Sequence, residues 1–220
     1  MSRLSPASRR EQSRRATDLA LRRAAFRLIE EHGYEATSTE EIARAAGVSA
    51  RTFFNYFPNK EALFRLPAQP LGANITTTIR SRPPGEDPVL STAVAAMETF
   101  RILAAVATAD QADLLLASLR LMLNDPDCRR FLEDRRELAE RTAWQALLSR
   151  GVSRDDLATR AAVSAIVAAS FVALAVWVER DGAEPLPALL ARCLVGLPEP
   201  TRLAGGLLRP EATADSGIAE

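Results

Sequence analysis

The sequence has few of the residues on which most enzyme sites are built. It contains one histidine, His32, and two cysteines, Cys128 and Cys193, which lie far apart in the chain. Neither cysteine has a partner at the spacing of a metal site or a redox pair, and nothing resembles a disulfide framework. No Ser/His/Asp set, phosphate loop or metal cluster is visible. We therefore expect no enzyme activity, no cofactor and no bound metal, and we place the protein in a reducing cytoplasm.

The first residues also lack the apolar stretch that a secretory signal requires. Arginines recur from Arg3 to Arg15, and residues 1–13 are rich in Ser and Arg with few apolar side chains. We therefore expect no export, and we predict that residues 1–13 form a disordered arm.

The chain has no net charge either, because 28 Lys and Arg residues balance 28 Asp and Glu residues. The charge is unevenly spread, since residues 1–60 hold ten Arg and one Lys against seven acidic residues, a net charge of +4, and the remainder carries −4. A basic N-terminal unit before an acidic remainder is typical of a DNA-binding module joined to a different domain. Charge alone leaves open a chance asymmetry in an Arg-rich sequence.

Strand patterns and internal repeats are absent too, whereas helical periodicity recurs from the start of the chain. Apolar positions predict an amphipathic helix over about residues 17–32, which Gly33 ends. Ser38 then precedes Glu41 by three residues, which is the spacing of a capping box. A second helix is therefore expected to begin near residue 39.

This second helix stops at Gly47, and Ser49 can cap a third helix that begins at Ala50. Two short helices joined by a turn of about three residues form a helix-turn-helix, which we place at residues 38–57. A fourth short helix follows over residues 60–64. We expect the four helices to pack into one small unit.

The second helix of such a motif enters the major groove of DNA, where its first residues meet base edges. Arg51 and Thr52 stand at that position. Arg51 can donate two parallel hydrogen bonds to a guanine, and Thr52 offers a hydroxyl and a methyl group that suit a thymine. We predict that these two residues read the DNA sequence.

Other residues are candidates for contacts to the DNA backbone. Asn55, Tyr56 and Lys60 are polar residues on or after a helix that turns phenylalanines inward, so we interpret them as phosphate contacts. Helix N-termini also attract phosphates, which adds Thr39 and Ser49, although a serine cap has a purely structural function as well.

The phenylalanines of the third helix divide into two kinds. Phe53 and Phe57 are four residues apart and are predicted to pack in the core. Phe54 lies off that stripe, so we expect it at the surface, where it is a candidate for contact with the DNA backbone or sugar.

Three stretches of the sequence resemble the tetracycline-repressor (TetR) family. They are Ala24-Ala25 through Gly33-Tyr34, Thr39-x-x-Ile42-Ala43-x-x-Ala46-Gly47-Val48-Ser49, and Thr52-Phe53-Phe54-Asn55-Tyr56-Phe57-x-x-Lys60-x-x-Leu63, within residues 14–66. The resemblance implies an all-helical homodimer whose first three helices bind an operator and whose C-terminal helices hold a small-molecule pocket and the dimer contact. Ligand binding would then release the operator. Phe54 departs from the family, which commonly has a tyrosine there whose hydroxyl contacts a phosphate.

From residue 88 to about residue 196, every segment of the sequence predicts a helix. These helices are expected at about 88–108, 111–124, 127–150, 154–180 and 185–196. Residues 161–178 carry no charge and reach the lower limit for a membrane span. Because seven of its eighteen residues are alanine and charged residues precede it, we favour a helix buried between its own domain and a partner subunit over membrane insertion. We predict a homodimer through about 154–180 and 185–196, which also suits a palindromic operator.

The predicted fold class is therefore all-α, with an N-terminal three-helix DNA-binding domain and a larger helical domain. Five prolines from Pro67 to Pro88 indicate a hinge, and a polar stretch with prolines and glycines ends the chain. The predicted parts are a disordered arm (1–13), a DNA-binding domain (14–66), a hinge region (67–87), a ligand-binding and dimerisation domain (88–197), and a disordered tail (198–220). Within the hinge region, residues 73–80 can form a short helix.

A ligand pocket is expected among the helices of residues 88–180. Five apolar candidates for its walls, each of which also suits plain core packing, are Phe100, Met122, Phe131, Trp144 and Trp177. The segment from Pro126 to Phe131 resembles regulators of this family that answer acyl-CoA-like ligands, and this would let phosphates meet Arg129, Arg130, Arg135 and Arg136. We favour the alternative, in which the face is solvated and its arginines Arg136 and Arg141 pair at helical spacing with Glu133, Glu137 and Glu140.

Together these observations predict a sequence-specific DNA-binding transcriptional regulator, a repressor that a small apolar or acyl-CoA-like ligand releases from a palindromic operator. An activator of the same family fits the same residues, because the sign of regulation depends on where the operator lies. An architectural DNA-binding protein without effector would keep the N-terminal half but would not require the large apolar second domain.

Overall fold

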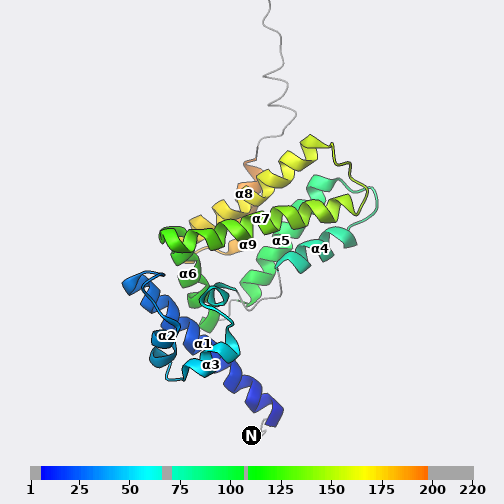
Figure 1. Cartoon of the computed structure of the whole chain (residues 1–220). Helices are drawn as coiled ribbons and strands as arrows, with labels where there is room; N and C mark the ends of the chain where they lie inside the picture. Colours follow the sequence, from blue (N-terminus) through cyan, green and yellow to red (C-terminus); the bar gives the residue numbers. More distant parts are fainter. Residues whose placement is uncertain (1–5, 66–70, 107–108, 198–220) are drawn as a thin grey trace, which may run out of the picture.

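The computed structural model describes residues 6–65, 71–106 and 109–197, and within them it contains helices and no strand. This confirms the predicted all-α class. The N-terminal helices gather at one end of the molecule (Figure 1). They are α1 (Pro6–His32), α2 (Thr39–Ala45), α3 (Ala50–Tyr56) and the short 3-10 helix η1 (Lys60–Phe64). η1 stands where a fourth helix was expected.

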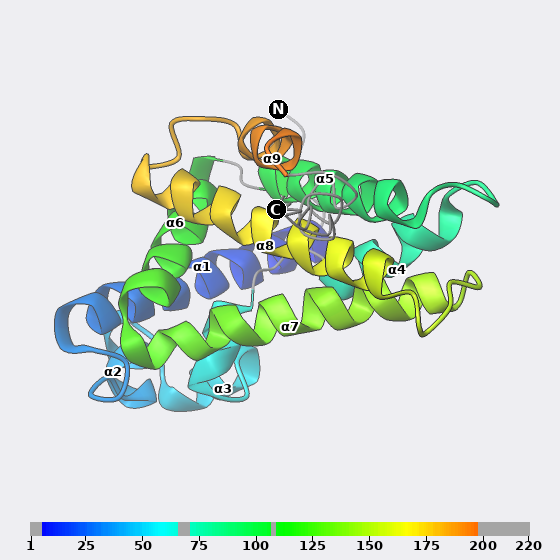
Figure 2. The same cartoon turned by 90° about the horizontal axis from the view of Figure 1, so that it is seen from above.

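The remaining described helices form a second, larger lobe. They are α4 (Leu71–Ser81), α5 (Pro88–Val106), α6 (Ala109–Asn124), α7 (Pro126–Leu148), α8 (Leu157–Glu179) and α9 (Leu186–Val195). α7 packs against α4, α6 and α8, and α5 packs against α4, α8 and α9. Seen from above, α7 and α8 run alongside each other across this lobe (Figure 2). The five helices predicted between residues 88 and 196 are all confirmed.

One hydrophobic core runs through the N-terminal lobe and continues into the second lobe. Its N-terminal part is centred on Leu21, Ile42 and Phe53, whose side chains have no solvent exposure. The same cluster includes Leu119 and Met122 of α6, because α1 packs against α6. The two lobes therefore share buried surface and are not joined by a connector alone.

A second contact between the lobes lies where η1 meets α7. The ring of Phe64 stacks on that of Phe131, with 4.8 Å between centroids, and Tyr34 packs edge-on against Phe131 at 5.4 Å. Two arginines fix the backbone of η1 from either side. Arg135 of α7 donates to the Phe64 carbonyl, and Arg22 of α1 donates to the Leu63 carbonyl. η1 is thus held between α1 and α7.

Part of the predicted N-terminal arm is helical. α1 begins at Pro6, so the helix expected from about residue 17 is longer and includes residues 6–13, while residues 1–5 lie outside the described residues. Proline is well tolerated at the first helical position, where its missing N–H would have had no partner, and the Arg, Glu and Gln that follow are good helix formers. The tail predicted over 198–220 also lies outside the described residues.

Most of the predicted hinge is likewise helix. The short helix expected over residues 73–80 is present and extends over α4, which packs against α5 and α7. No proline falls inside α4, and Ile75 and Ile79, four residues apart, point into a second buried cluster with Trp144 and Leu147. This segment belongs to the helical bundle of the second lobe.

Two described helices are long and apolar enough to cross a bilayer, namely residues 88–105 of α5 and the whole of α8. Both pack against helices on several sides, α8 against α5, α6, α7 and α9. Such packing is what a core helix of a bundle shows, and it favours the predicted core helix over a membrane span.

Candidate nucleic-acid interface and ligand pocket

Local hydrogen bonds set the start of α2 and the turn that follows it. The Ser38 hydroxyl accepts from the Glu41 N–H at 3.2 Å, and the Glu41 carboxylate accepts from the Ser38 N–H at 2.9 Å. This is the predicted capping box. Gly47, just after α2, has a φ of +72°, a left-handed conformation that glycine adopts without strain. The turn therefore brings the chain back for α3.

α3 has one buried side and one exposed side. Ser49 caps it by accepting from the Thr52 N–H at 3.1 Å. Phe53 and Phe57 are buried in the core, as predicted, whereas Phe54 is 51% exposed. The helix can therefore be held by its phenylalanines while its other face remains open to a partner.

The two predicted base-reading residues differ in their surroundings. Arg51 is exposed at the first turn of α3. Thr52 is half-buried, and its hydroxyl shares a hydrogen bond of 2.8 Å with that of Ser49. The Thr39 hydroxyl donates to Glu40 at 3.1 Å at the start of α2. All three positions lie at helix N-termini, where free N–H groups favour an anion.

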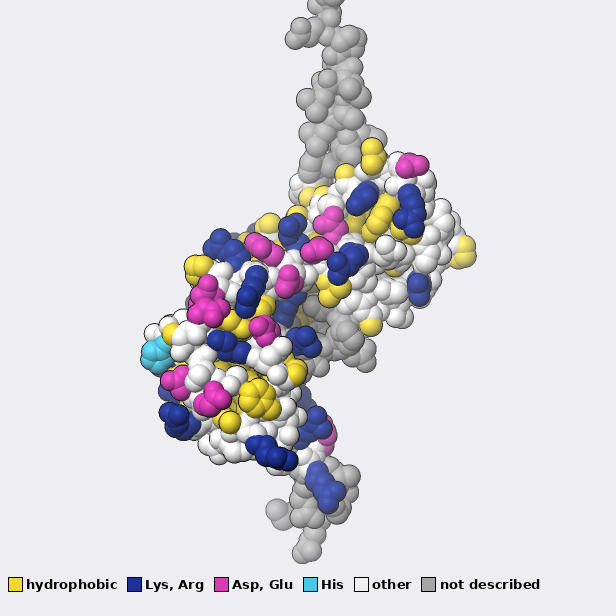
Figure 3. All heavy atoms as spheres, in the orientation of Figure 1, with side chains coloured by type: hydrophobic (Ala, Val, Ile, Leu, Met, Phe, Trp, Pro, Cys, Tyr) yellow, Lys and Arg dark blue, Asp and Glu magenta, His cyan; other side chains and the backbone are white. Residues whose placement is uncertain are grey.

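A depression lies where the start of α1 meets the end of α3. It is lined by Arg10, Ser13, Arg14, Asn55 and Tyr56, and the guanidinium of Arg14 lies 5.9 Å from the centre of the Tyr56 ring. Arg10 and Arg14 therefore lie beside Asn55 and Tyr56, two residues predicted to contact phosphates. On the face drawn in Figure 3, Lys and Arg side chains line the lower edge of the molecule, at the end that holds these helices. The sequence pattern does not place Arg10 and Arg14 beside Asn55 and Tyr56, because it predicts a disordered arm up to residue 13 and a helix only from about residue 17.

Lys60 has a structural position. Its ammonium group donates to the carbonyl of Tyr34 at 2.5 Å and to that of Thr37 at 2.9 Å, and it lies 4.0 Å from the centre of the Tyr34 ring. These contacts join η1 to the segment between α1 and α2. Two of its three N–H donors are used, so its predicted phosphate contact would depend on the third.

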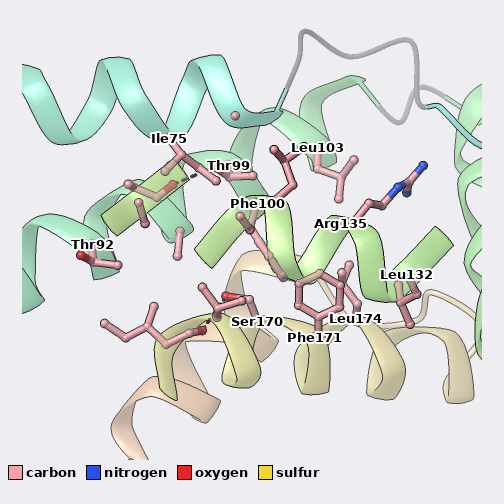
Figure 4. A pocket seen from close by; sticks show the side chains of 18 of the residues that line it. Ile75, Thr92, Thr99, Phe100, Leu103, Leu132, Arg135, Ser170, Phe171 and Leu174 are labelled. Atoms are coloured by element: carbon pink, nitrogen blue, oxygen red, sulfur yellow. Dashed lines mark hydrogen bonds between the residues drawn. The ribbon is translucent and has the colours of Figure 1, made fainter. Parts of the chain in front are cut away.

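The second lobe encloses an apolar pocket of about 110 Å³ between α4, α5, α6, α7 and α8. Its walls include Ile75, Phe100, Leu115, Leu132, Phe171 and Leu174 (Figure 4). Hydroxyl groups at its edge are already satisfied, since Thr92, Thr99 and Ser170 each donate at 2.8 Å to the carbonyl four residues earlier. A pocket of this kind suits a small apolar ligand.

Comparison with known proteins identifies the N-terminal module. Residues 21–66 match the model of the bacterial regulatory proteins of the tetR family. The N-terminal module is therefore of the tetR family. The matched segment contains α2, α3 and η1 entire.

Two curated relatives are similar to parts of the chain. The transcriptional regulator TcmR of Streptomyces glaucescens is 36% identical over 84 residues, which is 38% of this chain and 37% of that protein. The transcriptional repressor ComR of Escherichia coli (strain K12) is 48% identical over 48 residues, 22% of each chain. The chain thus matches well under half the length of either relative.

A solved structure resembles nearly the whole fold. The fatty acid degradation regulator FadR from Bacillus halodurans is 22% identical, over 95% of this chain and 100% of that one, with a TM-score of 0.52. At this level of identity the similarity concerns the fold. It places the tetR-family helix-turn-helix and the second lobe in one known arrangement.

Of the five apolar residues predicted for the pocket, the structure places only Phe100 on its wall. Met122 is fully buried in the core near α1, and Phe131 packs between the lobes. Trp144 belongs to the second buried cluster, and the Trp177 ring packs closely against Gly182 in the turn after α8. Contact of any of the five with a ligand stays a prediction.

The four arginines predicted to meet acyl-CoA phosphates do not form one site. Arg130 lies over the rings of Tyr34 and Phe131 and 3.8 Å from the Glu61 carboxylate. Arg129 and Arg136 are exposed and do not line the pocket, and Arg135 alone borders it. The alternative of glutamate pairs on a solvated face holds for Glu137, which accepts from Arg141 at 3.0 Å.

Proposed function

We propose that this tetR-family regulator is a homodimeric repressor, acting in the cytoplasm, that leaves a palindromic operator when a small apolar ligand fills the pocket of the second lobe. The observation that carries the proposal is the position of α7. Its residues Leu132, Arg135 and Ala139 line the pocket, while Phe131 and Arg135 hold η1 of the DNA-binding lobe. Any shift of α7 caused by a ligand is therefore passed to η1.

η1 follows α3 directly in the chain, so a movement of η1 also moves α3, the helix proposed to bind the operator. Phe64 at its end packs on Phe26 and Tyr34 as well as on Phe131. Because aromatic rings in a dense core move together, displacing Phe131 repositions Phe64 and with it the unit that holds α3. Ligand binding would then change the spacing or tilt of the two recognition helices in a dimer, which must match two half-sites.

The proposed dimer contact lies on α8 and α9. Along α8 the exposed residues Ala161, Ala168 and Val172 fall on one face at helical spacing, and on α9 Ala188 and Val195 are exposed. Small apolar residues permit close contact between helices, and burying such a face in a two-fold interface is favourable.

Selection of bound fragments from the source genome by the purified chain, at physiological salt, tests the proposal. We expect recovery of a short palindrome, whose half-sites are one or more helical turns apart. Binding that shows no sequence preference and falls steeply with salt would indicate an architectural DNA-binding protein instead. Ligands found by screening thermal stability should then lower affinity for the recovered palindrome, and a ligand that raises this affinity would contradict a releasing effector.

A further inference from the structure

Arg135 is the one ionisable residue among the described residues that line the pocket. The rest of the described lining is hydrocarbon apart from Gly72 and three hydroxyl residues, whose protons are donated to their own helices. None of these described lining residues is acidic. A ligand inside the pocket therefore meets hydrocarbon walls, and the one charge that these residues carry is at the Arg135 end.

The position of this cation is defined by the bundle. Arg135 lies at the end of the pocket near Leu103 and Leu132, with its guanidinium pointing away from Thr92 (Figure 4). That end faces the DNA-binding lobe, since the guanidinium donates to the carbonyl of Phe64. The positive charge is thus placed between the pocket and η1.

The described residues give Arg135 no anionic partner within salt-bridge distance, and its bond to Phe64 is with a neutral carbonyl. Burial, and to a lesser degree the positive charge of Arg22, lowers the pKa of Arg135 to about 10. The group is still charged at neutral pH, so a partly desolvated cation lacks a counter-ion. Such a site favours an anion, and a guanidinium presents paired N–H donors that match a carboxylate.

We propose that the effector is a small monocarboxylic acid with an apolar body, whose carboxylate pairs with Arg135 and takes it from the carbonyl of Phe64. This rests on the proposed function and names its ligand. When Arg135 turns to the acid, η1 loses one of the two arginine contacts that hold its backbone, and the Arg22 bond to Leu63 is left alone. The same side chain would then sense the ligand and release the DNA-binding lobe.

The volume of the pocket limits the body of the acid. At about 110 Å³ it is somewhat smaller than a cavity of about 150 Å³ that is known to admit benzene. We therefore expect acids such as benzoate or hexanoate to place only the ring or alkyl chain in the pocket, directed toward Thr92 and Thr99, with the carboxylate at the Arg135 end outside the apolar walls. A long acyl chain would need the bundle to open.

Calorimetric titration of the full chain with benzoate and hexanoate, beside benzyl alcohol and hexanol as uncharged controls, tests the inference. Each acid should bind at least tenfold more tightly than its alcohol, at one ligand per chain. In the Arg135→Met variant, which keeps the unbranched stem, this preference should vanish. Arg129→Met, an exposed position on the same helix, should keep it. Equal binding of acid and alcohol to the unmodified chain, or a preference that survives Arg135→Met, would overturn the inference.

Further measurements keep this test separate from that of the proposed function. If Arg135→Met does not fold, Ala139→Leu, which fills the pocket and leaves the arginine, should abolish acid binding. Hexanoyl-CoA is titrated as well, and tighter binding of the thioester than of free hexanoate would contradict a carboxylate site. Release of the operator by an uncharged apolar compound alone would retain the proposed function and refute the acid. Arg135-dependent acid binding that leaves operator affinity unchanged would support the acid site and contradict the proposed release of the operator by a ligand in this pocket.

Discussion

Arg51 is the residue whose predicted role is easiest to separate from stability. It is exposed on the first turn of α3, so removing it leaves the core intact. Arg51→Ala should weaken binding to the selected operator by about 1–3 kcal/mol and relax the preference at one base pair. Fluorescence anisotropy with a set of operators, each changed at one position, measures both effects. Unchanged affinity and preference would show that another residue reads the sequence.

Tyr56→Phe tests the predicted contact of Tyr56 with a DNA phosphate. The substitution keeps the ring against Arg14 and Phe57 and removes only the hydroxyl. It should therefore weaken binding to all sequences equally and leave base preference unchanged. Lys60 is a poor choice for this test, because its substitution also removes two bonds to backbone carbonyls and would disturb the lobe itself.

Glu86 predicts a pH dependence of stability. Hydrogen bonds from Arg82, at 2.7 and 2.5 Å, and from Ser91, at 2.8 Å, lower the pKa of this carboxyl to about 2 from 4.5. A lowered pKa means that the folded state favours the carboxylate, so its contribution is complete above pH 4.5 and is lost as the pH falls toward 2. The melting temperature of Glu86→Gln should therefore lie below that of the unmodified chain at neutral pH and converge with it as the pH approaches that lower value.

Glu133→Gln is the control for that measurement, because Glu133 is exposed and lies on a different helix. Its melting temperature should follow that of the unmodified chain across the pH range. If the difference between Glu86→Gln and the unmodified chain stayed constant from neutral to strongly acidic pH, the carboxylate of Glu86 would not be stabilised by its partners.

At the scale of elements, local signals were enough to predict the helix-turn-helix. The capping box of Ser38 and the turn at Gly47 each depend on residues a few positions apart, so their spacing is visible in the sequence. The pocket could not be found in this way, because its walls come from five helices. Four of the five predicted aromatic or large residues fill space elsewhere in the core, whereas small residues such as Ala95, Ala139 and Ala143 are among those that line the cavity. The position of these alanines, and not that of the aromatic residues, is the sequence signal that could have indicated the pocket.

α4 lies in the segment that was predicted to be a hinge because five prolines fall in or next to it. The prolines lie before and after the helix, so they bound it and do not break it. Because Ile79 is fully buried, Ile79→Ala should lower the free energy of unfolding by about 2–5 kcal/mol. Urea titration followed by circular dichroism measures this change. Thr77→Ala, an exposed neighbour, should change it little, and equal small effects of both would support a loose hinge.

At the scale of the whole molecule, the described chain leaves aliphatic side chains in water on one face of α8. Val172 is 54% exposed there, and Leu90 on α5 is exposed to a similar extent, 51%, which makes the two residues a matched pair. If α8 forms the dimer contact, Val172→Arg places a charge in an apolar interface and should convert dimer to monomer, whereas Leu90→Arg should not. Sedimentation velocity at micromolar concentration distinguishes the two states.

Operator binding should follow the same pattern, because a palindrome is read by two recognition helices held at fixed spacing. Val172→Arg should lose most of its affinity for the full palindrome while keeping that for a single half-site, since α3 lies in the other lobe. Leu90→Arg should bind both as the unmodified chain does. A Val172→Arg protein that stayed dimeric and kept its palindrome affinity would move the dimer contact away from α8, and with it the route by which a ligand beside α7 could alter the spacing of the two α3 helices.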